Sequence, residues 1–246
     1  MQLSTVIITK NEEKSISECL KHLGCSDEVI VIDNDSSDNT VLIAHKLGAR
    51  TYKISGLDFS YMRNIGKEKA RGKWILYIDA DEKLSDDLKN EITKIVEIEQ
   101  QYAAYYIQRK NYFFGEPCPG VEKMLRLVRK DALLGWQGSL HETPMVAGKT
   151  GILKSYLFHY THNDLSSMIT KTNEWSEIEA QLRYKNNHPS MSWWRFLRVM
   201  ISGFWDSYIK SQGWKMGMTG LIESIYQAFS NFITYAKLWE KQNRRK

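Results

Sequence analysis

The sequence predicts an α/β fold in which helices cover both faces of a mostly parallel sheet and a helical extension follows. Three observations lead to this prediction. Apolar strand patterns alternate with helical patterns over residues 1–80, the apolar run at 74–78 ends in closely spaced acids, and helical patterns rich in tryptophan fill residues 193–246. The composition, 42% hydrophobic and 26% charged over 246 residues, is typical of one large globular domain with an appendage.

Four strands joined by three helical crossovers are expected before residue 80, and this alternation predicts parallel pairing. The expected strands are residues 3–9, 27–33, 50–54 and 73–79. Helical patterns are expected at residues 11–23 and 58–72, and residues 34–48 are expected to form a polar turn followed by a helix that ends near Gly48. Asn11 is the expected cap of the first helix. Further along, KMLRLVRK at residues 123–130 alternates as a half-buried strand does, and its arginines either contact an anionic acceptor or are solvated.

The N-terminus and the cysteines predict a cytoplasmic protein. MQLSTVIITKNEE enters an apolar strand without the basic region or cleavage site of a signal peptide, and no run of about 18 apolar residues suggests a spanning helix. Cys19, Cys25 and Cys118 are odd in number and lack metal-type spacing, so reduced thiols are expected.

The positive charge is concentrated near the C-terminus. Residues 183–246 hold 11 Lys and Arg against three acids, a local net charge of +8 within an overall +5. The same segment contains five of the eight tryptophans. This combination is compatible with nucleic-acid binding, with an anionic membrane surface, or with an aromatic helix pair that only packs on the main domain.

Polar residues follow three of the expected strands, at the sheet edge where α/β proteins bind ligands. They are the segments 9–12 (TKNE), 33–38 (DNDSSD) and 79–82 (DADE). Asp79 and Asp81 place two acids on one side of an extended segment, as a divalent cation that also holds phosphate oxygens requires. The alternative is that Asp81, Glu82 and Ser85 cap the next helix. The chain has no Gly-rich phosphate loop, which leaves the metal as the main means of neutralising a phosphate.

In order and spacing, four segments resemble the glycosyltransferase family 2 enzymes of the GT-A (Rossmann-like) fold. They are VIITKNEE, VIVIDNDSSDNT, YMRNIGKEKARGKWILYIDADEKLS and GSLHE, beginning at residues 6, 29, 61 and 138. LFHYTHNDLSSMITKTNEWSEIEA and NFITYAKLWEKQ, near the C-terminus, resemble the branch with lipopolysaccharide-core β-glucosyltransferases. The resemblance implies an inverting transferase that moves a hexose, glucose by preference, from a UDP-sugar to a glycan or lipid-linked acceptor.

The resemblance also implies site residues for the donor and the metal. The donor residues would be Thr9, Asn11, Glu12, Asp33, Asn34, Arg63, Asn64 and Asp79. Many relatives have an acid and a glycine where this chain has Asn34 and Asp35. Asp81 would bind Mg²⁺ or Mn²⁺ directly, with Asp79 and His159 completing the metal site. A structural role is the alternative for His159. His162 is a second histidine that could complete the metal or diphosphate site, and helix capping is the alternative for it.

An inverting transfer needs a base that takes the proton of the acceptor hydroxyl. Glu142 fits this role within the Gly-rich, Pro-terminated loop GWQGSLHETP, because relatives carry an acid in this region. His141 is the rival candidate.

We expect a catalytic domain at residues 1–162, with a nucleotide-sugar half to about residue 100 and an acceptor half at 101–162, and a helical region at 163–246 that rests on the inner face of the cell membrane. Two other classes stay open. A nucleotidyltransferase would place a Gly-rich basic loop where TKNEE stands, and a noncatalytic binder of membranes or nucleic acid would leave the acids unexplained. No nucleic-acid partner is expected.

Overall fold

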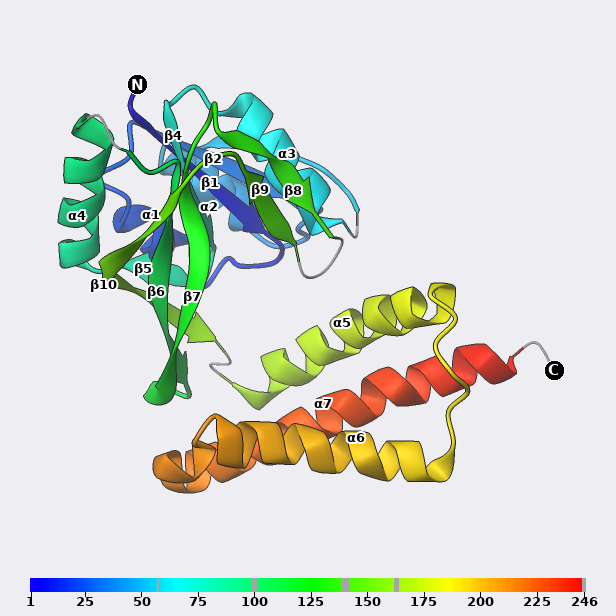
Figure 1. Cartoon of the computed structure of the whole chain (residues 1–246). Coiled ribbons are helices and arrows are strands. Elements are labelled where there is room, and N and C mark those ends of the chain that lie inside the picture. The colour runs from blue at the N-terminus through cyan, green and yellow to red at the C-terminus, as the bar shows by residue number, and fades with distance from the viewer. Residues whose placement is uncertain (57, 99–100, 139–141, 162–163, 245–246) are drawn as a thin grey trace. The chain divides into compact units, whose positions relative to one another are not determined.

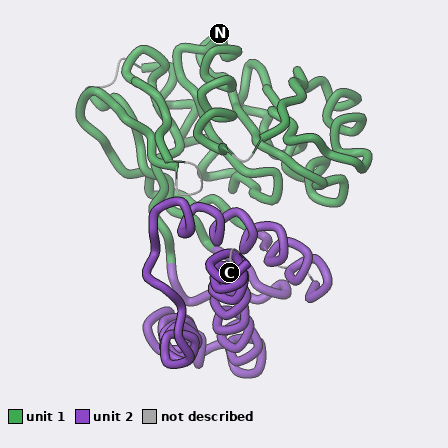
Figure 2. The backbone as a smooth tube through the Cα atoms, turned by 90° about the vertical axis from the view of Figure 1, so that its right-hand side faces the viewer, with its two compact units in different colours: residues 1–110, 121–159 green, residues 111–120, 160–246 purple. Residues whose placement is uncertain are grey.

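The protein divides into two compact units, seen in a computed structural model that describes residues 1–56, 58–98, 101–138, 142–161 and 164–244. The first unit comprises residues 1–110 and 121–159, and the second comprises residues 111–120 and 160–246 (Figure 2). The first unit contains most of the sheet and the second contains the C-terminal helices (Figure 1).

The strands and helices follow the predicted order as far as β4. The strands are β1 (Leu3–Thr9), β2 (Glu28–Asp33), β3 (Arg50–Lys53), β4 (Trp74–Asp79), β5 (Glu82–Leu84), β6 (Ala104–Phe113), β7 (Glu116–Arg129), β8 (Leu133–Gln137), β9 (Thr143–Val146) and β10 (Thr150–Thr161). The helices are α1 (Ile16–Lys21), α2 (Thr40–Lys46), α3 (Phe59–Lys69), α4 (Asp86–Glu97), α5 (Leu165–Lys185), α6 (Trp193–Trp205) and α7 (Gly217–Asn243), with a π-helical turn η1 (Asp206–Lys210) and a 3₁₀ turn η2 (Gly213–Met216) between the last two.

The parallel half of the sheet confirms the predicted alternation. The strand order is β3-β2-β1-β4-β7-β6-β10-β5, and the pairs β3/β2, β2/β1 and β1/β4 are parallel. Consecutive strands from β1 to β4 are joined through α1, α2 and α3, and helical crossovers are the usual connection between parallel strands. The carboxyl ends of β1, β2 and β4 therefore meet at one edge of the sheet.

The other half of the sheet is largely antiparallel. β7 pairs antiparallel with β4, β5 pairs antiparallel with β10, and β8 and β9 form a separate two-stranded sheet. The strand expected at residues 123–130 is the second half of β7. The sheet is therefore mixed, because only the first four strands alternate with helices.

Two clusters of buried side chains show that helices cover both faces of the sheet. Successive residues of β1 alternate between them: Ile7 packs with Ile16 of α1 and Leu88 of α4, whereas Val6 packs with Met62 of α3. This alternation follows from the period of two in a strand. The predicted layer arrangement is confirmed.

The first helix begins later than the sequence predicts. α1 starts at Ile16, and Asn11 adopts a left-handed backbone with φ of 54°. The side-chain oxygen of Asn11 accepts a hydrogen bond of 2.8 Å from the backbone N–H of Ser37, in the loop that follows β2. Asn11 therefore does not cap α1 but joins two loops at the edge of the sheet.

The second unit confirms the predicted helical extension. α7 packs against α5 and α6, with Met168, Tyr226 and Phe113 in one buried cluster and Ala180, Met191 and Leu238 in another. Among the described residues, no helix combines the length and the apolar character needed to cross a bilayer.

Glu223 of α7 gives the second unit a pH-dependent stability. Burial raises the pKa of Glu223 to about 7 from its ordinary 4.5, although a hydrogen bond from Gln227 favours the charged form. The pKa of Glu223 is higher in the folded protein than in the unfolded chain, so the protonated carboxyl favours the folded state. This stabilisation is complete below about pH 4.5 and is lost as the pH rises through about 7. At pH 8 we expect Glu223→Gln to unfold with a free energy roughly 2 kcal/mol larger than the wild type, measured by urea denaturation.

The control is Glu240→Gln, which removes an exposed glutamate of the same helix that pairs with Arg244. Its unfolding free energy should follow that of the wild type between pH 5 and 8 within about 0.5 kcal/mol. If Glu223→Gln also follows the wild type over that interval, Glu223 is not protonated in the folded protein.

Candidate functional site

The predicted donor residues begin at the edge where three parallel strands end. The register pairs Thr9 at the end of β1 with Asp33 at the end of β2, and pairs Ile8 with Asp79 at the end of β4. Thr9 and Asp33 are buried, and the hydroxyl of Thr9 has no hydrogen-bond partner within the described chain. An unsatisfied buried hydroxyl at a ligand-binding edge is available to a bound molecule.

The loops that follow β1 and β2 are hydrogen-bonded to each other. The backbone N–H of Asn11 donates to the Ser36 hydroxyl at 2.9 Å, and that of Glu12 donates to Thr40 Oγ1 at 2.8 Å. The buried carboxylate of Asp33 accepts from the backbone N–H of Ser36 at 3.0 Å. These bonds fix the loops on which the predicted nucleoside contacts depend.

The departure from the family pattern at residues 34 and 35 has a local structural role. Asn34 is buried, and its side-chain oxygen accepts from the backbone N–H of Gly56 at 3.2 Å. Asp35 has a left-handed backbone with φ of 57°, and its carboxylate lies 2.7 Å from Lys53 Nζ. Both side chains thus connect the end of β2 to the segment around β3.

Arg63 of α3 joins the donor side of the site to the predicted base. Its Nη2 lies 3.1 Å from Asp79 Oδ1, and its Nε lies 2.8 Å from Glu142 Oε1. The guanidinium is buried with its carbon 4.8 Å from the centre of the Trp136 ring, and Nη1 has no partner among the described residues. One cation therefore holds two carboxylates of different predicted roles and keeps a donor free.

Asn64, the neighbour of Arg63, has both side-chain groups engaged. Its Nδ2 donates to the backbone oxygen of Trp136 at 3.1 Å, and its Oδ1 accepts from the backbone N–H of Trp136 at 2.9 Å. Asn64 thus ties α3 to β8, the strand that leads toward Glu142. Its contact with a donor stays a prediction.

Asp79 is held by arginines. Its Oδ2 lies 2.7 Å from Nη2 of Arg126, a fully buried residue of β7. Burial alone would raise the pKa of Asp79, but the charges of Arg126 and Arg63 outweigh this effect and hold the pKa well below its usual range. Asp79 is consequently ionised, and its carboxylate pairs with three guanidinium groups, because Arg109 Nη1 also lies 3.8 Å from its Oδ2.

Glu82 forms a charged network with Asp79 and the arginines that bind it. The Glu82 side chain is inaccessible to solvent, and its Oε2 accepts from the backbone N–H of Asp79 at 2.8 Å. Its Oε1 lies 3.0 Å from Nη1 of Arg109 and 3.5 Å from Nη2 of Arg126. Glu82 therefore fixes the orientation of the segment that carries Asp79 and Asp81, so it has a positioning function in place of helix capping.

The sequence alone did not identify Arg126 and Arg109 as site residues. Arg126 occupies the same face of β7 as Met124 and Val128, so an alternating apolar face contains one arginine. An arginine at such a position needs buried acids as partners. That pattern was the available signal, and it favours burial over the solvated or acceptor-binding positions considered for Arg126.

Asp81 and His159 form the pair that best fits a divalent cation. Asp81 Oδ2 lies 3.3 Å from His159 Nε2, and both side chains are slightly exposed. Burial alone would lower the pKa of His159, but the hydrogen bond to Asp81 and its charge raise it. A carboxylate and an imidazole are suitable ligands for Mn²⁺, and the remaining positions would be filled by phosphate or water oxygens. No cluster of three or more metal-ligating side chains occurs among the described residues.

The capping alternative applies to Ser85 alone among the residues considered for it. Ser85 accepts from the backbone N–H of Leu88 and caps α4. Glu82 belongs to β5, and Asp81 lies before that strand beside His159.

The predicted base Glu142 lies directly before β9, in the connection from β8. Its carboxylate is mostly buried, and its Oε1 lies 2.8 Å from Nε of Arg63. The rival His141 and the capping candidate His162 lie outside the described residues.

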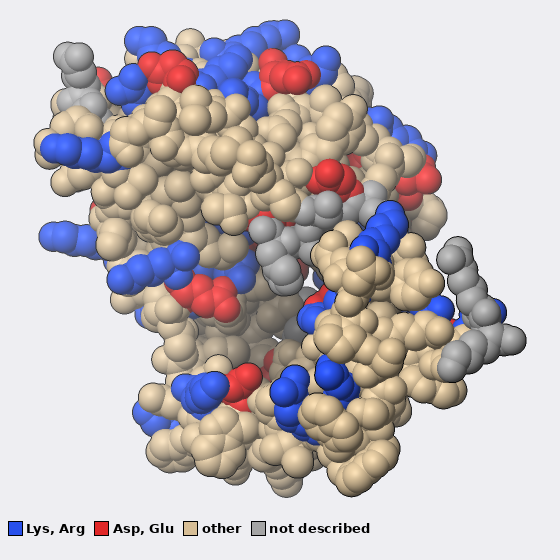
Figure 3. Space-filling model, turned by 45° about the vertical axis from the view of Figure 1, so that its right-hand side comes forward, with Lys and Arg blue, Asp and Glu red and all other residues tan. Residues whose placement is uncertain are grey.

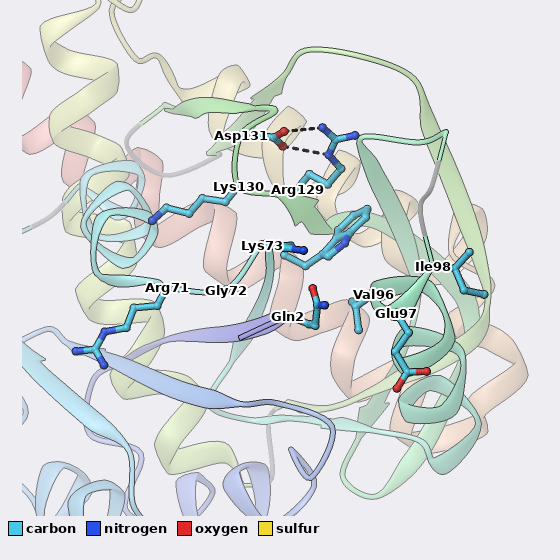
Figure 4. A pocket seen from close by; sticks show the side chains of 11 residues that line it. Gln2, Arg71, Gly72, Lys73, Val96, Glu97, Ile98, Arg129, Lys130 and Asp131 are labelled. Atoms are coloured by element: carbon cyan, nitrogen blue, oxygen red, sulfur yellow. Dashed lines mark hydrogen bonds and ion pairs between the residues drawn. The ribbon is translucent and has the colours of Figure 1, made fainter.

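One cavity of about 840 Å³ lies at the opposite edge of the sheet from these residues. Figure 4 shows its lining, which includes Gln2 before β1, Lys73 before β4, and the ion pair of Arg129 with Asp131 after β7. Arg129 is therefore a partly solvated cation. Solvation was one of the two alternatives expected for the arginines of residues 123–130. Because β1 and β4 begin here, this cavity is separate from the site at their carboxyl ends.

Comparison with known proteins identifies the class of enzyme. The sequence profile described as glycosyl transferase family 2 matches residues 4–156, and the chain belongs to this family. An uncharacterized glycosyltransferase of Rickettsia typhi is 30% identical over 256 residues, with 97% of this chain and 87% of the relative covered. The lipopolysaccharide core biosynthesis glycosyltransferase LpsC of Rhizobium meliloti is 23% identical, with 98% and 93% covered.

A solved structure shows the same fold. The crystal structure of Staphylococcus aureus TarS residues 1–349 in complex with UDP-GlcNAc aligns with a TM-score of 0.50 at 16% identity, covering 100% of this chain and 93% of that one. The fold is therefore GT-A, as the sequence resemblance implies. The protein is a family 2 glycosyltransferase, which decides against the nucleotidyltransferase and the noncatalytic binder.

Proposed function

We propose that the protein transfers a hexose, with glucose as the first candidate, from a UDP-sugar to a saccharide of the lipopolysaccharide core, with inversion at the anomeric carbon and with the help of Mg²⁺ or Mn²⁺. The name of the Rhizobium meliloti relative supports the acceptor class. The UDP-GlcNAc in the TarS complex supports a UDP-sugar donor. Residues 1–162 are the proposed catalytic domain, and residues 163–246 are the proposed helical region.

The proposed reaction is a single displacement. The acceptor hydroxyl oxygen bonds to the anomeric carbon, the bond from that carbon to the diphosphate oxygen breaks, and the diphosphate leaves with the bonding electrons. Glu142 takes the proton of the hydroxyl. Asp81 and His159 would hold the divalent cation, which when bound offsets the charge of the departing diphosphate.

The bridging position of Arg63 is the observation that carries this proposal. Asp79, at the end of β4, and Glu142, in the loop before β9, are 63 positions apart in the sequence but bind the same guanidinium, at 3.1 and 2.8 Å. A donor seated at the sheet edge would therefore lie within reach of the carboxylate that accepts the proton. The unpartnered Nη1 of Arg63 is suited to a phosphate oxygen of the donor.

The proposed acceptor class supports a location at a membrane. A core saccharide is built on a lipid, so an enzyme that extends it works at the surface where that lipid resides. We therefore propose a peripheral location on the cytoplasmic face of the cell membrane.

A screen of nucleotide sugars tests the proposal. The full-length protein with Mn²⁺ should hydrolyse a UDP-hexose slowly, and should do so faster than it hydrolyses GDP-, CDP- or dTDP-sugars. Release of the free nucleoside diphosphate is the readout, and product anomer analysis by NMR with an added acceptor tests inversion. Preference for a nucleotide other than UDP would overturn the donor assignment, and would point to Asn34 and Asp35 as its origin.

A further inference from the structure

The outer side of α6 presents large apolar side chains to solvent. Trp193, Leu197, Ile201 and Trp205 follow one another at intervals of four residues and therefore lie along one side of the helix. With Trp194 they have exposed fractions between 45% and 75%, and we call these five side chains the α6 face. A groove of about 590 Å³ is lined by Trp194, Ile201 and Trp205, with Lys210 of η1 at its border.

The inner side of the same helix already supplies the packing that the fold requires. Val199 is buried, the Phe196 ring lies 5.7 Å from that of Phe232 in α7, and Gly203 faces Asn231 so closely that a β-carbon at residue 203 would meet its amide at 2.4 Å. α6 is therefore apolar on both sides, and its outer side is not needed for contact with α7. An exposed apolar surface of this extent is typical of an interaction site.

Cations accompany the tryptophans of this region. The guanidinium carbons of Arg195 and Arg198 lie 5.0 and 5.8 Å from the centre of the Trp194 ring, and Lys215 lies 5.5 Å from that of Trp214. Residues 193–216 contain four cations and one acid, Asp206, for a net charge of +3. Lys and Arg side chains stand among uncharged ones on the face of the molecule drawn in Figure 3.

These features fit the interface of an anionic bilayer. Tryptophan is enriched at the level of lipid headgroups, and basic residues beside it attract anionic phospholipids. With 13 residues, α6 measures about 20 Å, short of the ~30 Å hydrocarbon core, so it would lie in the plane of the interface. A second copy of the chain is a poorer partner, because a two-fold contact through this face would bring two groups of like charge together.

We propose that the α6 face, with Arg195 and Arg198 at its border, docks the enzyme on a bilayer containing anionic phospholipid, the apolar side chains entering the headgroup region. This surface would hold the enzyme at the membrane location of the proposed function. The physiological role of the docking therefore rests on that function. Binding itself depends only on the residues of the second unit.

Vesicle flotation with the full-length protein tests the apolar and the charged parts separately. Wild-type protein should float with phosphatidylcholine vesicles that contain phosphatidylglycerol, should float poorly with phosphatidylcholine alone, and should be released by salt. The double variant Leu197→Ser/Ile201→Ser should bind anionic vesicles more weakly than the wild type by a factor of about 10 or more. The double variant Arg195→Gln/Arg198→Gln should lose affinity for anionic vesicles by on the order of 10-fold, mainly at low salt.

Matched variants remove similar groups elsewhere. Ile169→Ser changes an isoleucine of α5 whose exposed fraction, 53%, is close to the 52% of Leu197, and Lys94→Gln/Lys123→Gln removes two exposed cations of the first unit. Both should float like the wild type. The inference fails if the α6 variants float like these controls, if neutral and anionic vesicles recover equal amounts, or if the wild type is a dimer that Ile201→Ser converts to a monomer.

Two further measurements separate this inference from the proposed function. Circular dichroism and melting temperature establish that the α6 variants are folded. Hydrolysis of the UDP-sugar without vesicles should be equal in the wild type and in the α6 variants. A protein that floats as expected but hydrolyses no nucleotide sugar would overturn the proposed function and leave the docking surface intact.

Discussion

Glu142→Gln should lower kcat by roughly 10²-fold or more, with the KM for the donor nearly unchanged. The amide keeps the size of the carboxylate and can still accept the hydrogen bond that Arg63 Nε donates at 2.8 Å. It cannot take a proton from the acceptor hydroxyl. The loss should therefore appear in the chemical step, measured by initial rates over a range of donor concentrations.

Two variants control this result. Glu91→Gln changes a glutamate of α4 whose carboxylate accepts hydrogen bonds from the backbone of Lys154 and Ser155, and its kcat should equal that of the wild type within error. His141→Ala tests the rival base. If His141→Ala abolishes transfer while Glu142→Gln retains it, the two roles must be exchanged.

The sequence was sufficient to predict the parallel half of the fold because that half is encoded locally. Strands such as residues 74–79 are continuous apolar runs with helical patterns between them, and their parallel pairing follows from the crossovers. The same argument places Thr9, Asp33 and Asp79 at one edge. The antiparallel strands that follow have no such alternation, and their order depends on contacts between residues distant in the sequence.

The charged network could not be predicted for the same reason. Arg126 reaches Asp79 and Glu82 across 47 and 44 positions, and Arg63 reaches Glu142 across 79. No local pattern encodes such pairs. The start of α1 was missed because Asn11 bonds to the loop after β2, a tertiary contact that replaces the expected cap.

The tryptophan-rich segment at residues 193–246, called the tail below, illustrates the limit of a composition argument. Both its helices were predicted, but composition does not distinguish a packed side chain from an exposed one. Phe196 and Ile201 are both large and apolar, and only the structure shows that the first contacts α7 while the second faces solvent. The membrane hypothesis for the whole tail thereby narrows to one side of α6.

Asp81→Ala should abolish transfer in saturating Mn²⁺ while the protein remains folded. Asp81 lies beside His159, whereas Asp79 is the carboxylate that pairs with the buried Arg63 and Arg126. Asp79→Asn should behave differently, because it deprives Arg63 and Arg126 of a shared carboxylate and should lower the free energy of unfolding by roughly 3 kcal/mol. Urea denaturation of the two variants separates a metal ligand from a residue that also supports the fold.

Metal binding supplies a readout that does not depend on turnover. Mn²⁺ in the presence of UDP should raise the melting temperature of the wild type, and Asp81→Ala should remove that increase. His159→Gln should reduce the increase, since the proposed ligand pair then retains one member. Transfer by Asp81→Ala within a few-fold of the wild type would show that Asp81 is not the metal ligand. If Asp79→Asn alone lost the Mn²⁺-dependent shift while remaining as stable as the wild type, the metal would have to bind at Asp79, and the arginines around it would have to release that carboxylate when the donor enters.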